Sequence, residues 1–242
     1  MKFLMKINEI QYIQEYFHFQ HLLCVEKNAS LSSETERALL AAGILKADGS
    51  GRYELRTEER LLFSSWEKMR FSVIRADNVS ENGLYCILAN EKEIIIFDQE
   101  DSRVEFNVFD FDAHVMDNIF CALGEIDASV STTSSFNVTL SVEEFTDLIS
   151  ASSPAELQKK AGFLGINPND LQFFISAIKS QENCSTLLCE DHQKCVGALT
   201  KIVNTEKCIC ALKHITPQDL SNERFTMIMG NAQKVVDSLY IL

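Results

Sequence analysis

The 242-residue chain alternates between two hydrophobic periods, and the whole alternation occurs twice. Ile10, Ile13 and Phe17 recur three and four positions apart, which places them on one face of a helix. Farther along, short apolar runs such as 93–97 and 224–229 are bounded by turn residues, which is typical of strands. Helices followed by strands along the chain predict an α+β fold.

Capping signals mark where the helices begin. Ser141 followed by Glu144 forms a capping box, and Ser153 before Pro154 combines an N-cap with proline at the first helical position. Ser33 gives a similar start in the first series. The expected helices span 8–17, 33–45, 58–66, 116–120, 141–149, 153–164, 170–178 and 236–240. The expected strands span 71–74, 83–88, 93–97, 104–108, 186–189, 195–203, 207–211 and 224–229.

The two series of elements predict an internal duplication. Each series contains three helices, an antiparallel four-strand meander and a terminal helix, and a small-polar segment lies between them. We predict a first α+β half at 1–127, a Ser/Thr linker at 128–136 and a second α+β half at 137–242. The fold class expected is therefore α+β, with two quasi-symmetric halves that share a central sheet.

Charge and composition narrow the classes of function. The formal net charge is −13, which disfavours nucleic acid and anionic membrane surfaces because both attract Lys and Arg. No apolar stretch approaches the roughly 20 residues of a membrane-spanning helix, and residues 1–6 lack the apolar core of a signal peptide. Most of the eight cysteines lie in apolar runs, as buried, reduced thiols do. We therefore expect a cytoplasmic protein without membrane insertion.

A group of cysteines and histidines in the second half is the strongest candidate for metal chemistry. It comprises Cys184, Cys189, His192, Cys195, Cys208, Cys210 and His214. Zinc takes four ligands in a tetrahedron, usually from closely spaced cysteine pairs, and the Cys184–Cys189 spacing fits this only loosely. Cysteines that fill strand interiors explain the same pattern. We expect no metal site.

Other chemistry-bearing groups favour structural roles. His18, His21 and Cys24 share one helical face, as a metal site or a Cys–His pair would require, but the surrounding aromatic and leucine residues indicate packing. The acidic residues near Asp98 and Asp112 suit turns, and Asp112 is expected to cap a helix. The sequence contains no phosphate-binding glycine loop, serine-hydrolase elbow or zinc-protease motif. We expect no enzyme activity, no catalytic residue and no cofactor.

Two apolar groups remain as candidate partner-binding residues. Phe225, Met227 and Met229 share one face of the last expected strand, and methionine suits adaptable binding surfaces. A core face covered by the half's own helices is the alternative explanation for these three. Leu171 and Phe174 lie on a helix that is apolar over more than one stripe, which favours burial between the halves.

The order of elements resembles a known family. The strand–turn–strand pattern at 84–97, the strand at 104–108 and the helix start at 109–115 are similar to EspG-type proteins, the cytosolic chaperones of mycobacterial type VII secretion. The segment 200–240 repeats this pattern, and the resemblance covers nearly the whole chain in order of elements. It implies two quasi-symmetric halves around a central antiparallel sheet flanked by helical bundles.

The composition departs from that family. The chain is rich in Ile, Lys, Asn, Phe and Cys, whereas typical actinobacterial members are rich in Ala, Arg, Gly and Val. This difference indicates a low-GC bacterium, in which the family's usual PE–PPE cargo is not expected. The resemblance then implies a related secretion system that exports WXG-type helical hairpins or their toxin-fused relatives.

The expected function is that of a non-enzymatic chaperone or targeting adaptor for such a secreted helical protein. It would cover an apolar helical tip that otherwise aggregates. The alternative is an acidic immunity or inhibitor protein that neutralises a basic toxin domain by electrostatic complementarity. A third possibility is an enzyme that acts through the Cys/His group. The partner's identity and the oligomeric state do not follow from the sequence.

Overall fold

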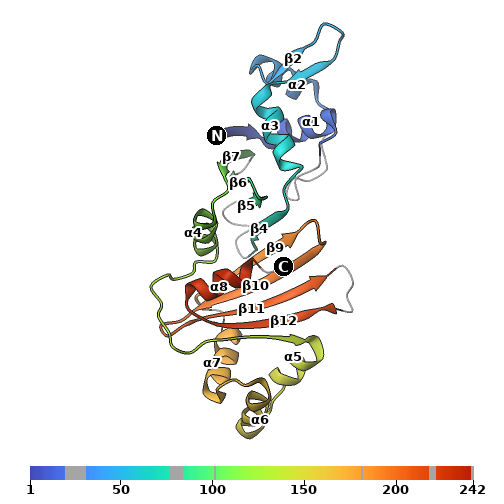
Figure 1. Ribbon diagram of the computed structural model, residues 1–242. Coiled ribbons are helices and arrows are strands. Elements are labelled where there is room, and N and C mark those ends of the chain that lie inside the picture. The colour runs from blue at the N-terminus through green and yellow to red at the C-terminus, as the bar shows by residue number, and fades with distance from the viewer. Residues whose placement is uncertain (20–30, 77–83, 101, 181, 218–221, 241–242) are drawn as a thin grey trace. The chain divides into compact units, whose positions relative to one another are not determined.

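The computed structural model describes residues 1–19, 31–76, 84–100, 102–180, 182–217 and 222–240 (Figure 1). The chain divides into two compact units. Unit 1 comprises Met1–Phe71 and Asn78–Phe111, and unit 2 comprises Ser72–Asp77 and Asp112–Leu242. The registered strand pairs in both units are antiparallel, so the predicted α+β class is confirmed.

Unit 1 is built on a sheet with the strand order β1-β7-β6-β5. These strands are β1 (Lys2–Lys6), β5 (Leu84–Ala89), β6 (Glu93–Glu100) and β7 (Arg103–Asp110). The helices are α1 (Ile7–Phe17), α2 (Ser33–Ala41) and α3 (Thr57–Trp66), with a hairpin of β2 (Leu45–Ala47) and β3 (Tyr53–Leu55) before α3. Trp66 of α3 stacks on Phe63 and contacts Phe106 of β7, which anchors α3 on the sheet.

Unit 2 contains a larger sheet with the order β4-β9-β10-β11-β12-β8. Its strands are β4 (Phe71–Arg75), β8 (Phe136–Ser141), β9 (Cys184–Asp191), β10 (Val196–Asn204), β11 (Ile209–Pro217) and β12 (Arg224–Gly230). Its helices are α4 (Ala113–Leu123), α5 (Val142–Ile149), α6 (Pro154–Leu164), α7 (Pro168–Lys179) and α8 (Ala232–Leu239).

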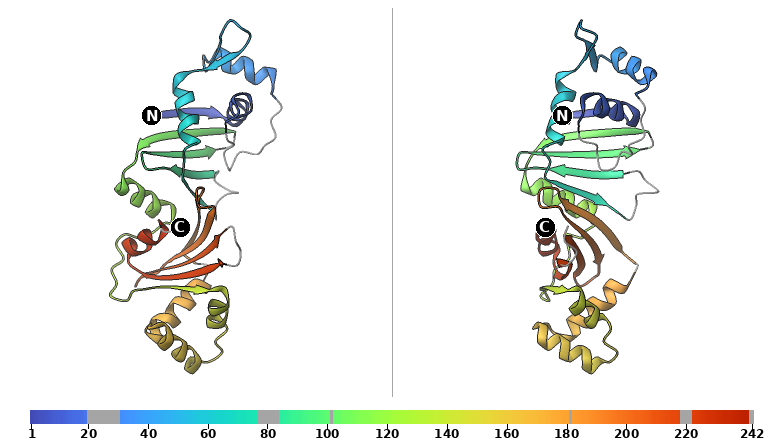
Figure 2. Two further views of the ribbon diagram at one scale, coloured as in Figure 1. Left: turned by 45° about the vertical axis from the view of Figure 1, so that its right-hand side comes forward. Right: turned by 90° about the vertical axis from the view of Figure 1, so that its right-hand side faces the viewer.

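Helices cover both faces of the unit 2 sheet. Positions an odd number apart in a strand point to opposite faces, and β11 shows both environments. Cys210 packs against Leu171 and Phe174 of α7, whereas Lys213 Nζ donates a hydrogen bond to the Ser238 backbone oxygen of α8 at 2.8 Å. Figure 2 shows α7 and α8 on opposite sides of these strands. This double cover explains why Ile209–Ala211 is buried without alternation.

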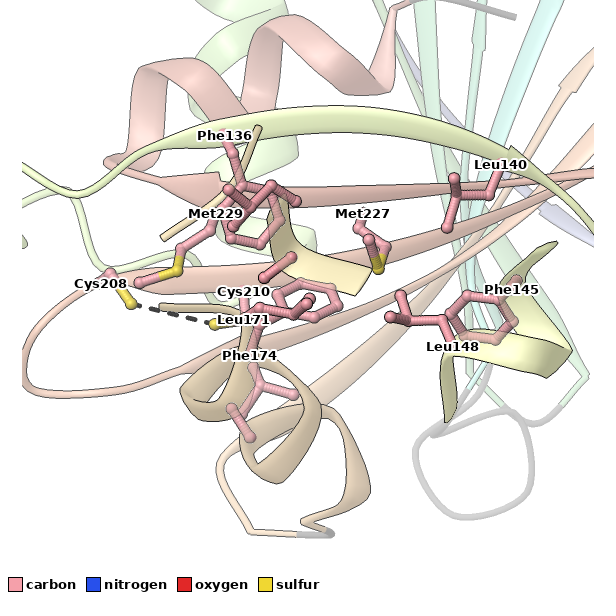
Figure 3. Packing of buried hydrophobic residues seen from close by; sticks show 14 residues of the cluster. Phe136, Leu140, Phe145, Leu148, Leu171, Phe174, Cys208, Cys210, Met227 and Met229 are labelled. Carbon is pink, nitrogen blue, oxygen red and sulfur yellow. Dashed lines mark hydrogen bonds between the residues drawn. The ribbon is translucent and has the colours of Figure 1, made fainter. Parts of the chain in front are cut away.

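The core on the α7 side combines aliphatic, aromatic and sulfur-containing side chains of unit 2 (Figure 3). We call it the α7-side core. Its buried members are Phe136, Leu140, Phe145, Leu148, Ala161, Ile166, Leu171, Phe174, Ala177, Val203, Cys208, Cys210, Met227 and Met229.

The expected helices and meander strands are present, but the expected starts of the two halves are wrong. Each begins with a strand, β1 or β8, before its first helix, and the β2–β3 hairpin was also missed. Phe3 and Met5 of β1 point inward between exposed neighbours, a period-two signal that is short and lies at a sheet edge. The α2 cap is Ser32 rather than Ser33, because the Ser32 hydroxyl accepts from the Glu34 amide.

The predicted boundary between the two halves falls inside unit 2. The segment 128–136 lies in unit 2, between α4 and β8, and α4 itself packs on α8 through the Phe120–Tyr240 ring contact. The internal duplication, the linker at 128–136 and the shared central sheet stay predictions. None of the helices in the described ranges is long and apolar enough to cross a membrane.

The buried Lys213 predicts a specific pH dependence of stability. Burial lowers its pKa from 10.5 to about 8, so below pH 8 the folded state carries a desolvated ammonium. As the pH rises from 8 to 10.5, the folded state loses this proton before the unfolded state does. The free-energy cost of burying the charged ammonium therefore declines. Lys213→Met is therefore expected to gain stability over wild type at pH 7, and the gain should shrink by about 2 kcal/mol at pH 10.

Urea unfolding of both proteins at the two pH values measures this change. Lys179→Met, at an exposed position at the end of α7, is the matched control. A difference between Lys213→Met and wild type that stays constant with pH would contradict the expectation.

Candidate functional site: an apolar pocket between α5 and α6

The five predicted partner-binding residues come together, but inside the protein. Leu171, Phe174, Met227 and Met229 are buried members of the α7-side core, and Phe225 is partly buried beside them. Phe225 stacks between the rings of Phe145 and His214, at centroid distances of 4.3 and 4.5 Å. Their role in partner contact stays a prediction, and their burial favours the alternative of a core face covered by the unit's own helices.

The predicted Cys/His group is dispersed. His192 and Cys195 are exposed in the β9–β10 turn, while Cys208 and Cys210 lie in the α7-side core. Burial raises the pKa of Cys189 to about 12, which makes this thiol a poor nucleophile. Within the described ranges, no three His, Cys, Asp or Glu side chains are grouped so that they could hold a metal ion.

A serine–histidine–glutamate contact in unit 2 was not foreseen from the sequence. Ser72 Oγ lies 3.0 Å from His192 Nε2 and donates to Glu190 Oε2 at 3.3 Å. In a hydrolytic triad the histidine stands between the serine and the acid, whereas here the serine occupies the middle. Because Ser72 is also buried, this arrangement suits a structural role better than acyl transfer. The expectation of no enzyme activity stays a prediction.

The remaining sequence candidates have simple outcomes. His18 caps the C-terminus of α1 in a left-handed conformation, with φ of 58°, while His21 and Cys24 lie outside the described residues. Asp112 caps α4 as predicted, because its carboxylate accepts from the His114 amide at 2.8 Å.

The surface feature that sequence analysis missed is an apolar pocket of about 180 Å³ between α5 and α6. Its floor and walls come from Leu140, Leu148, Phe163 and Leu164. The volume is below the roughly 300 Å³ at which pockets for drug-sized ligands begin. The pocket therefore suits a single apolar side chain of a larger partner.

Helix α5 provides one wall because its two faces differ. The Ser141–Glu144 capping box fixes its start, with the Glu144 amide donating to Ser141 Oγ at 3.2 Å. Phe145 and Leu148 then face the α7-side core. Val142 and Ile149 remain exposed, on another face of α5 than the pocket residues Glu144, Asp147 and Leu148.

Helix α6 provides the other wall and is only shallowly buried. Its inner stripe is Leu157, Ala161 and Leu164, at helical spacing, and Ala161 alone among its residues is fully buried. Phe163 lies off this stripe and is 81% exposed, with Lys159 Nζ at 6.0 Å from its ring centroid. An aromatic residue out of phase with its own helical stripe is a signal that the sequence carried.

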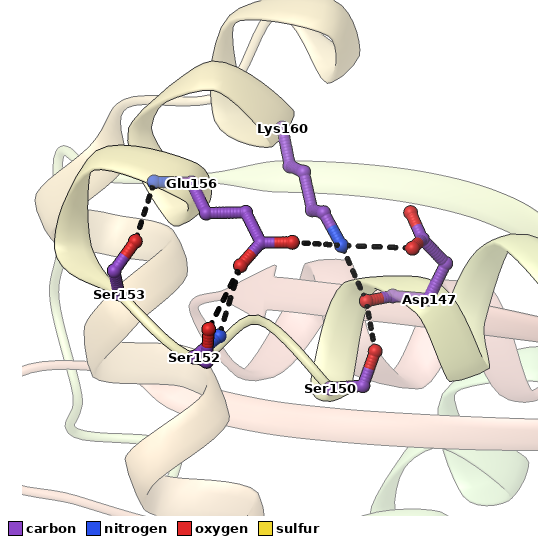
Figure 4. Close-up of polar contacts among 6 residues, drawn as sticks. All are labelled: Asp147, Ser150, Ser152, Ser153, Glu156 and Lys160. Atoms are coloured by element: carbon purple, nitrogen blue, oxygen red, sulfur yellow. Dashed lines mark hydrogen bonds and ion pairs between the residues drawn. The ribbon is translucent and has the colours of Figure 1, made fainter.

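A polar network holds α5 and α6 together at the pocket rim (Figure 4). Lys160 Nζ lies 3.0 Å from Asp147 Oδ1 and 3.4 Å from Glu156 Oε1, and it donates to the Asp147 backbone oxygen at 2.5 Å. Burial lowers the pKa of Lys160, but the hydrogen bonds that its ammonium donates to Asp147 and Glu156 outweigh this effect and raise the pKa overall. Two carboxylates on one ammonium, together with Glu144, leave the rim acidic.

A second pocket, of about 340 Å³, lies between α4 and α8 and differs in chemistry. His114, Asp117, Asn118 and Cys121 of α4 line one side of it. Asp117 accepts a hydrogen bond from the Tyr240 hydroxyl at 2.9 Å. This polar lining offers little to an apolar partner, so we take the α5–α6 pocket as the candidate site.

The rim network predicts acid sensitivity at Glu156. Its carboxylate accepts from the Ser152 amide at 3.0 Å, and this bond, followed by Lys160, holds its pKa below the usual 4.5. A lowered pKa contributes stability above pH 4.5 that is lost as the pH falls through the folded-state value. Glu156→Gln should therefore be less stable than wild type at pH 7, and this deficit should be smaller at about pH 3.

Thermal unfolding at the two pH values measures this, with Glu143→Gln in the first turn of α5 as the control. A deficit of Glu156→Gln that persists unchanged in acid would show that the charge of Glu156 is not responsible.

Comparison with known proteins gives a likeness of fold. No protein-family model and no curated protein matches the chain. Among solved structures, the Mycobacterium tuberculosis type VII secretion system chaperone EspG5, in complex with the PE25–PPE41 dimer, matches with a TM-score of 0.57. The match covers 99% of this chain and 94% of that chain at 8% sequence identity. The chain is thus distantly similar in fold to an EspG chaperone, as the order of its elements predicted.

Proposed function

We propose that this protein is a non-enzymatic, cytoplasmic chaperone or targeting adaptor for a helical protein exported by a type VII-like secretion system. The observation that carries the proposal is the fold likeness to EspG5 over nearly the whole of both chains, since that chaperone was solved together with the dimer that it binds. The α5–α6 pocket is the contact site that we assign to this function.

The exposure of Phe163 supports that site. An aromatic side chain that is 81% exposed beside an apolar pocket can bury most of its surface only when a partner covers it. Burial of one such side chain contributes about 1.5–3 kcal/mol, and aromatic residues next to pockets are frequent centres of binding energy.

The acidic rim indicates the chemistry of the partner. Glu144 and Asp147 border the pocket together with Lys160, whose charge is already matched by Asp147 and Glu156. A partner that inserts one apolar side chain and carries Lys or Arg on the flanking turn complements this rim. The exposed tip of a WXG-type helical hairpin, or of its toxin-fused relative, is the partner that we propose.

Replacement of Phe163 tests the site. Phe163→Ser is expected to weaken binding of the partner by at least about tenfold, because it removes the aromatic surface beside the pocket. The thermal midpoint should hardly change, because the side chain is already exposed. Co-expression with small helical proteins from neighbouring genes, followed by gel filtration, tests for a 1:1 complex, and calorimetry then measures its affinity.

Leu61→Ser is the matched control, since Leu61 is a 55% exposed apolar residue on α3 of unit 1. The site assignment fails if both variants bind alike. The chaperone function fails if no neighbouring export protein comigrates. A tight, strongly salt-dependent complex with a basic toxin domain would instead establish the immunity function.

A further inference from the structure

Two cysteine sulfurs lie in contact inside the α7-side core. Cys208 precedes β11 and Cys210 lies within it, two positions apart, so both side chains point to the face that α7 covers. Their sulfur atoms are 3.9 Å apart, and both residues are fully buried (Figure 3).

A third sulfur belongs to the same group. Met229 of β12 is the register partner of Cys210, so the two side chains stand directly opposite each other on one face of the sheet. In Figure 3 the thioether of Met229 extends toward the two cysteine sulfurs, whereas Met227 lies farther along β12, toward Leu140.

The side chains around the two cysteines favour a soft cation over a hard one. The buried members of the α7-side core that the structure describes are aliphatic, aromatic or sulfur-containing. Hard cations such as Mg²⁺ and Ca²⁺ need several oxygen ligands, and structural zinc takes four nitrogen or sulfur ligands. Two thiols and one thioether instead match the soft, low-coordinate preference of Cu(I).

The spacing of the sulfurs agrees with metal coordination. With metal–sulfur bonds of about 2.3 Å, a sulfur–sulfur separation of 3.9 Å corresponds to an angle of roughly 115° at the metal. That angle is close to trigonal, the arrangement expected for three sulfur ligands. The cysteine pair therefore needs little movement to hold a cation.

We propose that Cys208, Cys210 and Met229 form a three-sulfur binding site for Cu(I). Binding releases the two thiol protons to solvent and takes up one Cu(I), so the loaded site carries one net negative charge; the oxidation state does not change, because copper enters as Cu(I).

The β10–β11 turn gives the site a route to solvent. Thr205 Oγ1 accepts from the Cys208 amide at 3.1 Å and donates to the Cys208 backbone oxygen at 2.6 Å. Cys208 therefore directly follows a surface turn, and we expect the cation to enter by opening of the Thr205 contacts rather than by unfolding of α7. The site is separate from the α5–α6 pocket, so it stands independently of the proposed chaperone function.

Competition with a colorimetric Cu(I) chelator, bicinchoninate, tests the proposal. Reduced, metal-free, full-length protein is titrated anaerobically with Cu(I), with Cys195→Ser as the background in every sample because Cys195 is exposed. We expect this protein to retain one Cu(I) per chain against the chelator. Cys208→Ser and Cys210→Ser should each weaken retention by at least about tenfold.

Two methionine variants keep the test decisive if the serine variants unfold. Met-to-Leu changes conserve volume and are tolerated in cores, so Met229→Leu should fold and yet bind Cu(I) more weakly by about tenfold. Met227→Leu, in the same core and strand, and Cys189→Ser, on the opposite face of the sheet, should bind as the background protein does. Equal retention by Met229→Leu and Met227→Leu, or no retained Cu(I) in the background protein, would overturn the proposal.

Discussion

Burial of both faces of the unit 2 sheet determines where this protein can present apolar surface. β11 packs toward α7 through Cys210 and toward α8 through Lys213, so the strands themselves have no free face at their centre. Helices α5 and α7 use their apolar stripes on that sheet. α6 lies against its neighbouring helices and has Ala161 as its one fully buried residue. Phe163 lies on a different face of α6 from Ala161 and is therefore directed outward. The candidate surface is thus a consequence of the order in which the helices cover the sheet.

The pocket also depends on the polar contacts that fix its two walls. Lys160 of α6 binds both the side chain and the backbone of Asp147 at the end of α5, while Glu156 ties the start of α6 to Ser152 (Figure 4). These bonds set the distance between the helices without filling the space between them. Because the network contains more acidic than basic side chains, it also makes the rim negatively charged. This charge favours apolar partners that carry basic residues.

Much of the fold follows from local signals in the sequence. The capping box at Ser141 and the 3.6-residue period of the helices fix α5, α6 and α7 to within a few residues, and turn residues delimit the meander strands. The edge strands β1 and β8 are short and were missed. The candidate site was not predictable in the same way, because apolarity marks Met227 and Phe163 alike. The position of Phe163 off the α6 stripe is a signal in the sequence, but the tertiary cover of the sheet is what makes Met227 a core residue and leaves Phe163 at the surface.

The central claim is that a helical export partner seats its apolar tip between α5 and α6. Hydrogen–deuterium exchange of this protein, free and in its 1:1 complex, tests that claim most directly, because it maps the contact without a substitution. The account predicts slower exchange in 142–164, with the α4 and α8 amides unchanged. Slower exchange confined to segments outside unit 2, with α5 and α6 exchanging as in the free protein, would contradict it.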